Sequence, residues 1–282
     1  MPKNKFGIYI ANYGITNDPQ DYVDLAILSE NNGWDGFFLW DHVFFSSNKM
    51  QAFLDPWIIL SAVAVKTKRI KLGTTVTPLA RRRPWIIAKE VSTLDRLSKG
   101  RMVLGIGLGA DSDFSNFGEN TDRVIRRGKL DESLHILKGL WANKPFKFKG
   151  KFFNIKEVEF FPKPFQEKIP IWVGGNWPYK KPFQRAAQYE GVFPLKAGSE
   201  DALSPNEYRE IIKYIKQYRS SFDSYDIIKP FISTGLEKDD DWSFKNTFLN
   251  IGITWFVELI YPGRDSLDNI KKIISRGPPK IR

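Results

Sequence analysis

Cysteine is absent from this chain of 282 residues, and histidine occurs only twice. The missing cysteine excludes disulfide scaffolds, thiolate zinc sites, iron–sulfur clusters and thiol nucleophiles. The sequence also lacks an apolar run long enough to cross a membrane. The apolar stretch near the first residue is too short for the hydrophobic region of a signal peptide, so we expect a cytoplasmic protein.

Acidic residues are fewer than basic ones, and the net charge is +11. Much of the surplus lies between residues 66 and 101, a segment with eleven basic and two acidic residues. They fall on several predicted elements without a nucleic-acid-binding motif, so we interpret most of them as solvated and expect neither nucleic acid nor membrane as a partner. The contiguous Arg81, Arg82 and Arg83 differ because they follow a predicted strand, where one guanidinium could bind a phosphate or carboxylate.

Short apolar runs rich in β-branched residues alternate with amphipathic stretches along the chain. We predict strands at residues 6–10, 34–40, 70–76, 102–106, 169–173, 191–195, 227–234 and 253–260. We predict helices at residues 18–33, 55–66, 84–97, 123–141, 179–189, 205–221, 241–250 and 266–275. Eight such units predict an α/β fold, a single (β/α)8 TIM barrel that forms one domain over residues 1–282. Residues 142–168, rich in Phe and Lys, interrupt the alternation and predict an inserted hairpin or long loop.

A barrel of this kind holds its active site at the carboxyl ends of its strands, in the loops that lead into helices. Asp41 and His42 follow the second predicted strand. Imidazole ordinarily exchanges protons near neutral pH, so we predict that His42 is catalytic, with Asp41 facing the barrel mouth or supporting the imidazole. The second histidine, His135, lies among charged residues on a long predicted helix and is expected to be solvated.

Hydroxyl-bearing and small residues follow the third and fourth strands. Thr74 and Thr75 end the third strand, and their hydroxyls could bind a polar ligand ring. Residues 105–110 match the G-x-G-x-x-A pattern of dinucleotide-binding folds, but no predicted helix follows directly, as that fold requires. We therefore interpret Gly107 and Gly109 as positions where a flat ligand approaches the backbone.

A second glycine-rich segment, with Gly174, Gly175, Asn176 and Trp177, follows the fifth strand and precedes a predicted helix. Unpaired backbone N–H groups and the helix dipole favour an anion at such a position. Two lysines shortly after the segment add positive charge, so we predict a phosphate site here. No residue pattern indicates a metal site.

Taken together, five segments resemble the bacterial-luciferase-like family of flavin-dependent oxidoreductases, the luciferase-like monooxygenases. They are GWDGFFLWDHVF at 33–44 and the segments 69–109, 126–141, 169–194 and 276–279, the last of which reads RGPP. The resemblance implies a (β/α)8 barrel, in agreement with the strand count. It also implies a reduced flavin, either FMN or the deazaflavin coenzyme F420, across the carboxyl ends of the strands.

The family resemblance also implies roles for individual residues. It places Asp41 and His42 beside the flavin ring, with His42 as an acid or base. It implies a bulged, non-proline cis peptide behind the ring, between Thr75 and Val76. It further implies a cofactor phosphate held by Gly174, Gly175, Asn176 and either Arg126 or Arg127.

The chain departs from part of the family pattern. F420-dependent sugar-phosphate dehydrogenases that resemble it have a glutamate shortly after the glycines of the fourth strand. Here Ala110 follows those glycines, with Asp111 and Asp113 next, so their general acid is not carried over. Residues 196–252 match the family poorly, and the substrate is therefore not specified.

The resemblance predicts an enzyme, a luciferase-like monooxygenase that uses reduced FMN and oxygen on a small organic substrate. A separate reductase is the expected source of reduced flavin in that case. The alternative is an F420-dependent enzyme that transfers hydride without oxygen, and a third reading is a flavin-binding barrel without turnover. A homodimer through barrel helices is the assembly that the resemblance suggests.

Overall fold

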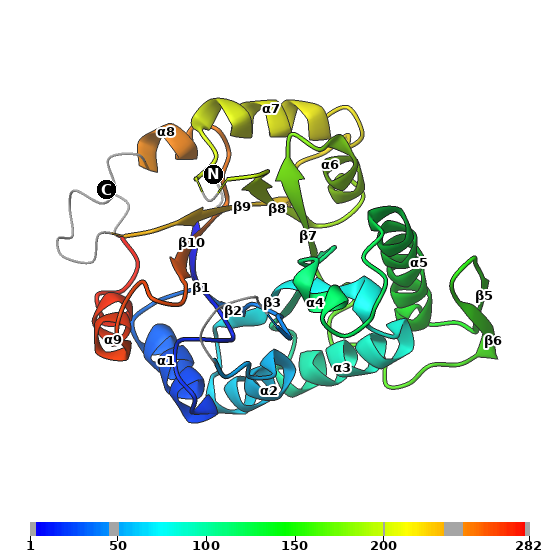
Figure 1. Ribbon diagram of the computed structural model, residues 1–282, viewed down its shortest axis with the longest axis horizontal. Coiled ribbons are helices and arrows are strands. Elements are labelled where there is room, and N and C mark those ends of the chain that lie inside the picture. Colours follow the sequence, from blue (N-terminus) through cyan, green and yellow to red (C-terminus); the bar gives the residue numbers. More distant parts are fainter. Residues whose placement is uncertain (1–3, 45–50, 200, 234–244, 280–282) are drawn as a thin grey trace.

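The computed structural model describes residues 4–44, 51–199, 201–233 and 245–279. Its centre is a closed barrel of eight parallel strands in the order β1-β10-β9-β8-β7-β4-β3-β2, with helices around the outside (Figure 1). The predicted (β/α)8 barrel is therefore confirmed. Among the described residues, no helix has both the length and the apolar character needed to cross a membrane.

The elements alternate as the sequence predicts. The barrel strands are β1 (Lys5–Ile10), β2 (Gly36–Leu39), β3 (Lys71–Pro78), β4 (Met102–Gly107), β7 (Ile171–Trp177), β8 (Gly191–Lys196), β9 (Asp226–Phe231) and β10 (Trp255–Ile260). The helices are α1 (Pro19–Asn31), α2 (Pro56–Lys66), α3 (Pro84–Leu97), α4 (Ser112–Ser115), α5 (Arg123–Trp141), α6 (Lys180–Ala186), α7 (Pro205–Ile215), α8 (Lys245–Leu249), α9 (Leu267–Ser275) and the 3₁₀ turn η1 (Leu79–Arg81). An antiparallel hairpin of β5 (Phe146–Lys149) and β6 (Asn154–Val158) projects beside α5, which confirms the predicted insertion (Figure 1).

Aspartate side chains fix where the first two helices begin. Asp18 accepts a hydrogen bond from the backbone N–H of Gln20, and Asp55 accepts from those of Trp57 and Ile58. A proline follows each aspartate, at the helical position where a backbone N–H is not needed. These caps determine where the loops after β1 and β2 end.

Large aromatic side chains fill the amino-terminal part of the barrel interior. Phe38, Trp172 and Trp255 are buried against one another, with ring centroids 4.9–5.6 Å apart. Glycines make room for them, because a Cβ on Gly36 would lie 2.4 Å from the Phe38 ring and one on Gly191 would lie 2.6 Å from Trp172. The free space of the barrel is therefore at the carboxyl ends of the strands.

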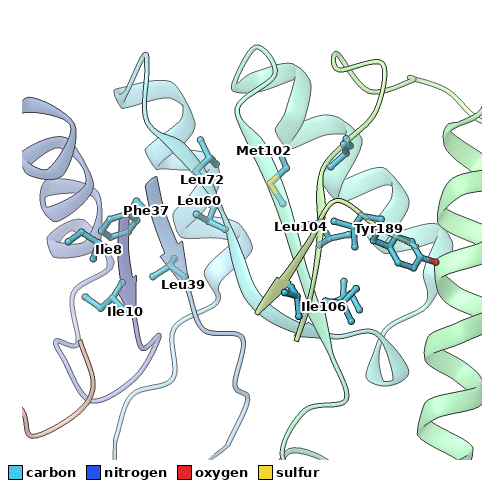
Figure 2. Close-up of a cluster of buried hydrophobic side chains, with 14 of the residues drawn as sticks. Ile8, Ile10, Phe37, Leu39, Leu60, Leu72, Met102, Leu104, Ile106 and Tyr189 are labelled. Atoms are coloured by element: carbon cyan, nitrogen blue, oxygen red, sulfur yellow. The ribbon is translucent and has the colours of Figure 1, made fainter. Parts of the chain in front are cut away.

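A larger apolar layer lies between the strands and the helices. Ile8, Phe37, Leu72 and Leu104 project outward from four neighbouring strands, and Leu60 of α2 packs in the same layer (Figure 2). Burial of each such side chain contributes about 1.5–3 kcal/mol. This layer holds the helices on the barrel and leaves the mouth loops to carry polar groups.

Two differences from the prediction affect the barrel mouth. β7 continues to Trp177, so residues 174–176 lie within a strand and not in a turn before a helix. The single helical turn α4 forms in the segment predicted as a loop. Elsewhere, α7 ends at Ile215, short of the predicted 221. The predicted end of a strand at 234 and the predicted helix start at 241–244 lie outside the described residues.

Candidate active site

The carboxyl ends of the barrel strands surround a cavity of about 400 Å³. A cavity of this size suits a small-molecule ligand. The residues that the sequence predicted for the site and that line this cavity are Asp41, His42, Thr75, Val76, Gly107, Gly109, Arg126, Gly174, Gly175 and Asn176. Segments far apart in the sequence therefore meet at one place in the fold.

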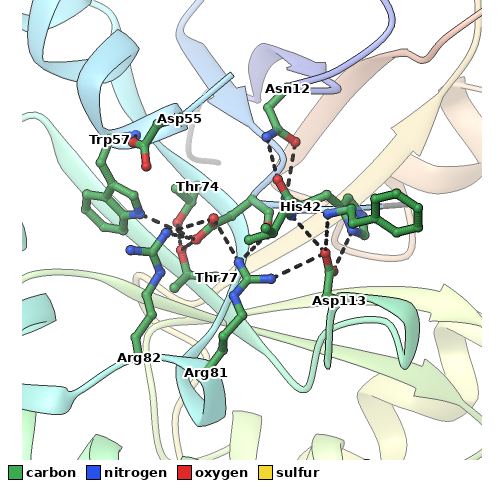
Figure 3. Close-up of polar contacts among 12 residues, drawn as sticks. Asn12, His42, Asp55, Trp57, Thr74, Thr77, Arg81, Arg82 and Asp113 are labelled. Carbon is green, nitrogen blue, oxygen red and sulfur yellow. Dashed lines mark hydrogen bonds and ion pairs between the residues drawn. The ribbon is translucent and has the colours of Figure 1, made fainter. Parts of the chain in front are cut away.

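His42 lies just beyond β2, and its imidazole contacts the carboxylate of Asp113 (Figure 3). Nδ1 of His42 lies 2.7 Å from Oδ2 of Asp113. The Asn12 side chain holds the His42 backbone, because its amide nitrogen donates to the His42 carbonyl at 2.8 Å and its oxygen accepts from the His42 N–H at 3.1 Å. The ring and the backbone of His42 are thus both fixed at the cavity wall.

Asp113 comes from α4 and is fully buried. Its Oδ1 accepts hydrogen bonds from the backbone N–H groups of Val43 and Phe44, at 2.8 and 3.0 Å. Burial alone would raise the pKa of Asp113, but the hydrogen bonds from His42 and these backbone groups lower the pKa below its usual value. The carboxylate is therefore ionised at neutral pH and acts only as a hydrogen-bond acceptor.

Asp41 has a different set of partners. Its carboxylate accepts hydrogen bonds from Nη2 of Arg82 at 2.9 and 3.0 Å and from Oγ1 of Thr77 at 2.8 Å. Nη2 of Arg81 lies 3.3 Å from Oδ1 of the same carboxylate. The support of the imidazole that the sequence offered to Asp41 therefore comes from Asp113, while Asp41 neutralises two arginines.

The arginine triplet has a different role from the one its position suggested. Arg81 bridges Asp41 and Asp113, and its Nη1 lies 3.3 Å from Oδ1 of Asp113 (Figure 3). Arg82 binds Asp41, and Arg83 is exposed at the start of α3. Two of the three guanidinium groups are therefore engaged by internal carboxylates and not by solvent or a ligand anion.

Strand β3 is irregular where it meets the cavity. The peptide bond between Thr75 and Val76 is cis, and the pairing of β3 with β4 shifts register there, as the family resemblance implied. A Cβ on Gly107 would lie 2.5 Å from a Val76 methyl group, and one on Gly174 would lie 2.8 Å from the other. Val76 therefore packs closely against Gly107, which also lines the cavity.

A buried guanidinium occupies another part of the cavity wall. Arg126 is 2% exposed, its Nη2 binds Asp111, and its guanidinium carbon lies 4.6 Å from the centroid of the Phe114 ring. Its Nε and Nη1 are buried without a hydrogen-bond partner among the described residues. Because a buried donor without a partner is costly, these two N–H groups suit a phosphate or carboxylate ligand.

The remaining lining combines flat apolar surface with a few polar groups. The hydroxyl of Thr75 is buried at the wall and makes no hydrogen bond within the described ranges. The apolar or aromatic side chains of the wall include Tyr9, Trp40, Leu130, Phe193 and Leu195. With the donors of Arg126, this surface fits a planar cofactor that carries a phosphate. The part of the chain that the structure describes holds no cluster of His, Asp or Glu that could bind a metal ion.

Three of the predicted cofactor contacts do not line the cavity. Thr74 is fully buried within β3. Trp177 is buried, with Nζ of Lys180 3.4 Å from the centroid of its ring. Arg127 is half-buried on α5 outside the lining, so of the two arginines that the resemblance offered, Arg126 is the one at the cavity.

Asp113 is the site residue that the sequence analysis did not identify. The sequence showed it only as one of two aspartates that follow Ala110. Its proximity to His42 depends on α4, which the loop prediction did not include. Arg81 and Arg82 were likewise noticed for their charge, but their carboxylate partners could not be assigned from the sequence.

Comparison with known proteins gives the site a context. Residues 5–216 match the family described as luciferase-like monooxygenase. An F420-dependent glucose-6-phosphate dehydrogenase of Microbacterium testaceum is 31% identical over 164 residues, which are 57% of this chain and 48% of that protein. The corresponding protein of Nakamurella multipartita is 32% identical over 168 residues, with the same shares covered. The match thus spans about half the length of these curated relatives.

Solved structures extend the likeness to almost the whole chain. An F420-dependent secondary alcohol dehydrogenase in complex with an F420–acetone adduct superposes with a TM-score of 0.81 and 17% identity, covering 96% of this chain and 97% of that one. The F420-dependent tetrahydromethanopterin reductase of Methanopyrus kandleri gives a TM-score of 0.72 and 18% identity, with 98% of both chains covered. At these identities the likeness establishes the fold.

Proposed function

The chain belongs to the luciferase-like monooxygenase family, and on that premise we propose that it is an F420-dependent oxidoreductase. Its substrate class is a small alcohol, or the matching carbonyl compound in the reverse direction. The observation that carries the proposal is the His42–Asp113 pair on the wall of a cavity that Arg126 also lines. The names of the matched relatives support F420 over FMN.

F420, when bound, would supply a two-electron acceptor for the hydride of an alcohol C–H bond. Arg126 would hold its phosphate through Nε and Nη1, the two buried nitrogen atoms without a partner. The flat wall near Tyr9 and Trp40 would contact the ring system. His42 would accept the hydroxyl proton of the alcohol and return it in the reverse reaction.

The residues around His42 suit this proton transfer. Oxidation of an alcohol to a carbonyl compound releases one proton, so a nearby acceptor lowers the barrier. Asp113 holds the imidazole and stabilises its protonated form by charge. Arg81 and Arg82 are paired with carboxylates, so they do not place an unpaired positive charge against a protonated His42.

The second candidate is the monooxygenase function that the sequence analysis placed first. Reduced FMN and oxygen would then act on the substrate, and the apolar wall with Trp40, Phe193 and Leu195 would limit access of water. The side chains of Trp57, Trp85 and Trp177 do not line the cavity. The wall suits either cofactor, but the His42–Asp113 pair gives the alcohol reaction a proton acceptor.

Turnover under two sets of conditions separates the candidates. The purified chain is mixed with F420 and a panel of small secondary alcohols without oxygen, and loss of the deazaflavin absorbance is followed. In parallel, it receives reduced FMN, oxygen and the same panel. We expect anaerobic reduction of F420 by at least one alcohol. Oxygen-dependent product formation with FMN, and none with F420, would replace this proposal with the second candidate.

A further inference from the structure

We infer that Asp113 is the positioning residue that places the hydrogen of neutral His42 on Nδ1, so that Nε2 is the nitrogen that exchanges the substrate proton. The inference rests on the proposed function, because it specifies how the proton acceptor of that reaction is prepared. The primary observation is the distance of 2.7 Å between Nδ1 of His42 and Oδ2 of Asp113. An ionised carboxylate can only accept a hydrogen bond, so Nδ1 must donate.

The other oxygen of Asp113 is fixed independently of the histidine. Oδ1 accepts hydrogen bonds from the backbone N–H groups of Val43 and Phe44, at 2.8 and 3.0 Å. Nη1 of Arg81 lies 3.3 Å from the same oxygen. The carboxylate therefore cannot turn away from His42 without breaking two backbone hydrogen bonds and its contact with Arg81, and the orientation of the pair is set before any ligand binds.

Neighbouring acids do not compete for this role. Asp41 precedes His42 directly, but its carboxylate is taken by Thr77, Arg81 and Arg82. Asp111 directly precedes α4, and its carboxylate binds Arg126. Asp113 is therefore the carboxylate that contacts Nδ1 and can select the tautomer of the imidazole.

The charges that face the imidazole come from several elements. Asp113 lies on α4, Asp41 follows β2 and Arg81 ends η1, while the rings of Tyr13 and Trp40 pack edge-on against the imidazole at 5.8 and 5.7 Å. In the forward reaction the substrate O–H bond breaks and an N–H bond forms at Nε2. The proton stays on the imidazole, because the reaction needs only one acceptor. Asp113 remains ionised, because its carboxylate accepts hydrogen bonds from His42, Val43 and Phe44.

Nitrogen NMR of histidine-labelled protein tests the inference without a cofactor or a substrate. The chain has two histidines, so the spectrum contains two rings, and His42→Asn identifies the one that disappears. The spectrum is recorded at a pH at which the imidazole is neutral. We expect the nitrogen signals of His42 to be those of the tautomer that carries its hydrogen on Nδ1. A wild-type ring with hydrogen on Nε2 would overturn the inference, whatever the outcome of the F420 assay.

Asp113→Asn provides the second arm of the test. The asparagine oxygen should stay on the N–H groups of Val43 and Phe44, which leaves its NH₂ group facing Nδ1. Nδ1 must then accept, so we expect the tautomer to switch to hydrogen on Nε2. With the best alcohol of the panel, kcat should fall roughly 10²–10⁴-fold, the range of general acid–base catalysis, while the Kd for F420 stays unchanged.

Two controls separate positioning from folding. Asp223→Asn removes the same charge from an exposed residue before β9 and should leave the tautomer and kcat at wild-type values. In the His42→Asn background, Asp113→Asn should cause no further loss of kcat, because its effect passes through the imidazole. A loss of kcat with an unchanged tautomer, or additive losses in the double variant, would contradict the inference.

Discussion

Two aspartates near the same histidine have separate functions in this molecule. Asp41 is adjacent to His42 in the sequence, yet its carboxylate serves Arg81 and Arg82. Asp113 is 71 residues away from His42 and contacts the imidazole directly. Of the two roles that the sequence left open for Asp41, the structure supports a place at the cavity, and Asp113 supports the imidazole, because ion pairs are decided by the fold and not by chain order.

Asp41→Asn should reduce the stability of the protein. The substitution leaves two largely buried guanidinium groups, Arg81 and Arg82, without their shared counterion. Removing one partner of such a buried pair costs about 3 kcal/mol or more in the free energy of unfolding. Urea denaturation at neutral pH measures the loss, with Asp223→Asn as the charge-matched control. A variant as stable as the control would show that the cluster is not a counterion site.

Individual site residues could be predicted to the extent that their chemistry is rare or their position is fixed by the barrel. His42 stands out as one of two histidines and follows a strand. The buried donors of Arg126 could not be foreseen, because an arginine on a helix is ordinarily solvated and its burial here depends on Asp111 and Phe114. Burial of a polar group is a property of packing, and the local sequence does not encode it.

At the scale of elements, the irregular end of β3 shapes the cavity. Val76 fills the space above Gly107 of β4 and Gly174 of β7. The three residues come from three strands, which makes this contact a junction between them. Its packing leaves no room for a methyl group on either glycine, so the shape of the cavity wall depends on side-chain volume at these positions.

Gly107→Ala should displace Val76 into the cavity and weaken cofactor binding. The new Cβ would lie 2.5 Å from a Val76 methyl group, which is closer than two carbon atoms can pack. We expect the Kd for F420 to rise at least about tenfold, equivalent to about 1.4 kcal/mol. Adding Val76→Ala removes that methyl group and should restore part of the affinity. No rescue in the double variant would argue against a clash at this junction.

Most elements could be predicted because local signals and the alternation pattern agreed. Asp18 and Asp55 cap helices where the sequence indicated, and the hairpin in residues 142–168 was expected from its composition. α4 was missed because one helical turn carries no periodic apolar pattern. β7 was predicted too short because its glycines resemble a turn, whereas strand pairing with β8 continues through them.

At the scale of the whole molecule, several of the basic side chains behind the net charge of +11 are engaged within the protein and are not available to a binding partner. Arg81 and Arg82 are held by internal carboxylates, and Lys180 lies over an aromatic ring. Lys229 of β9 is 4% exposed, with its Nζ 4.4 Å from the Phe248 ring centroid. Part of the positive charge is therefore held within the fold and does not form a surface for a polymeric partner.

Lys229 should make the stability of the barrel depend on pH in the alkaline range. Burial lowers the pKa of Lys229 to about 8, so between that value and its ordinary pKa the folded state binds fewer protons than the unfolded state. The free energy of unfolding should therefore rise as the pH increases through this window. Lys229→Met should remove this rise and increase stability at neutral pH by about 1–3 kcal/mol.

Urea denaturation of the wild type and of Lys229→Met between about pH 7 and 10 gives the difference directly, since all other titrating groups are shared. Identical pH slopes in the two proteins would mean that burial does not perturb this lysine. The measurement concerns only the barrel, and its result is independent of the cofactor.

The central claim is that the cavity binds F420 through Arg126, and equilibrium titration tests it most directly. Wild type, Arg126→Met and the exposed-surface control Arg209→Met are titrated with F420 and, separately, with FMN. We predict that F420 binds more tightly than FMN. Arg126→Met should weaken F420 binding roughly 10- to 100-fold, because hydrogen bonds to a charged group contribute about 1.5–3 kcal/mol, whereas Arg209→Met should match wild type. Binding of neither cofactor, or equal F420 affinity in all three proteins, would contradict the account.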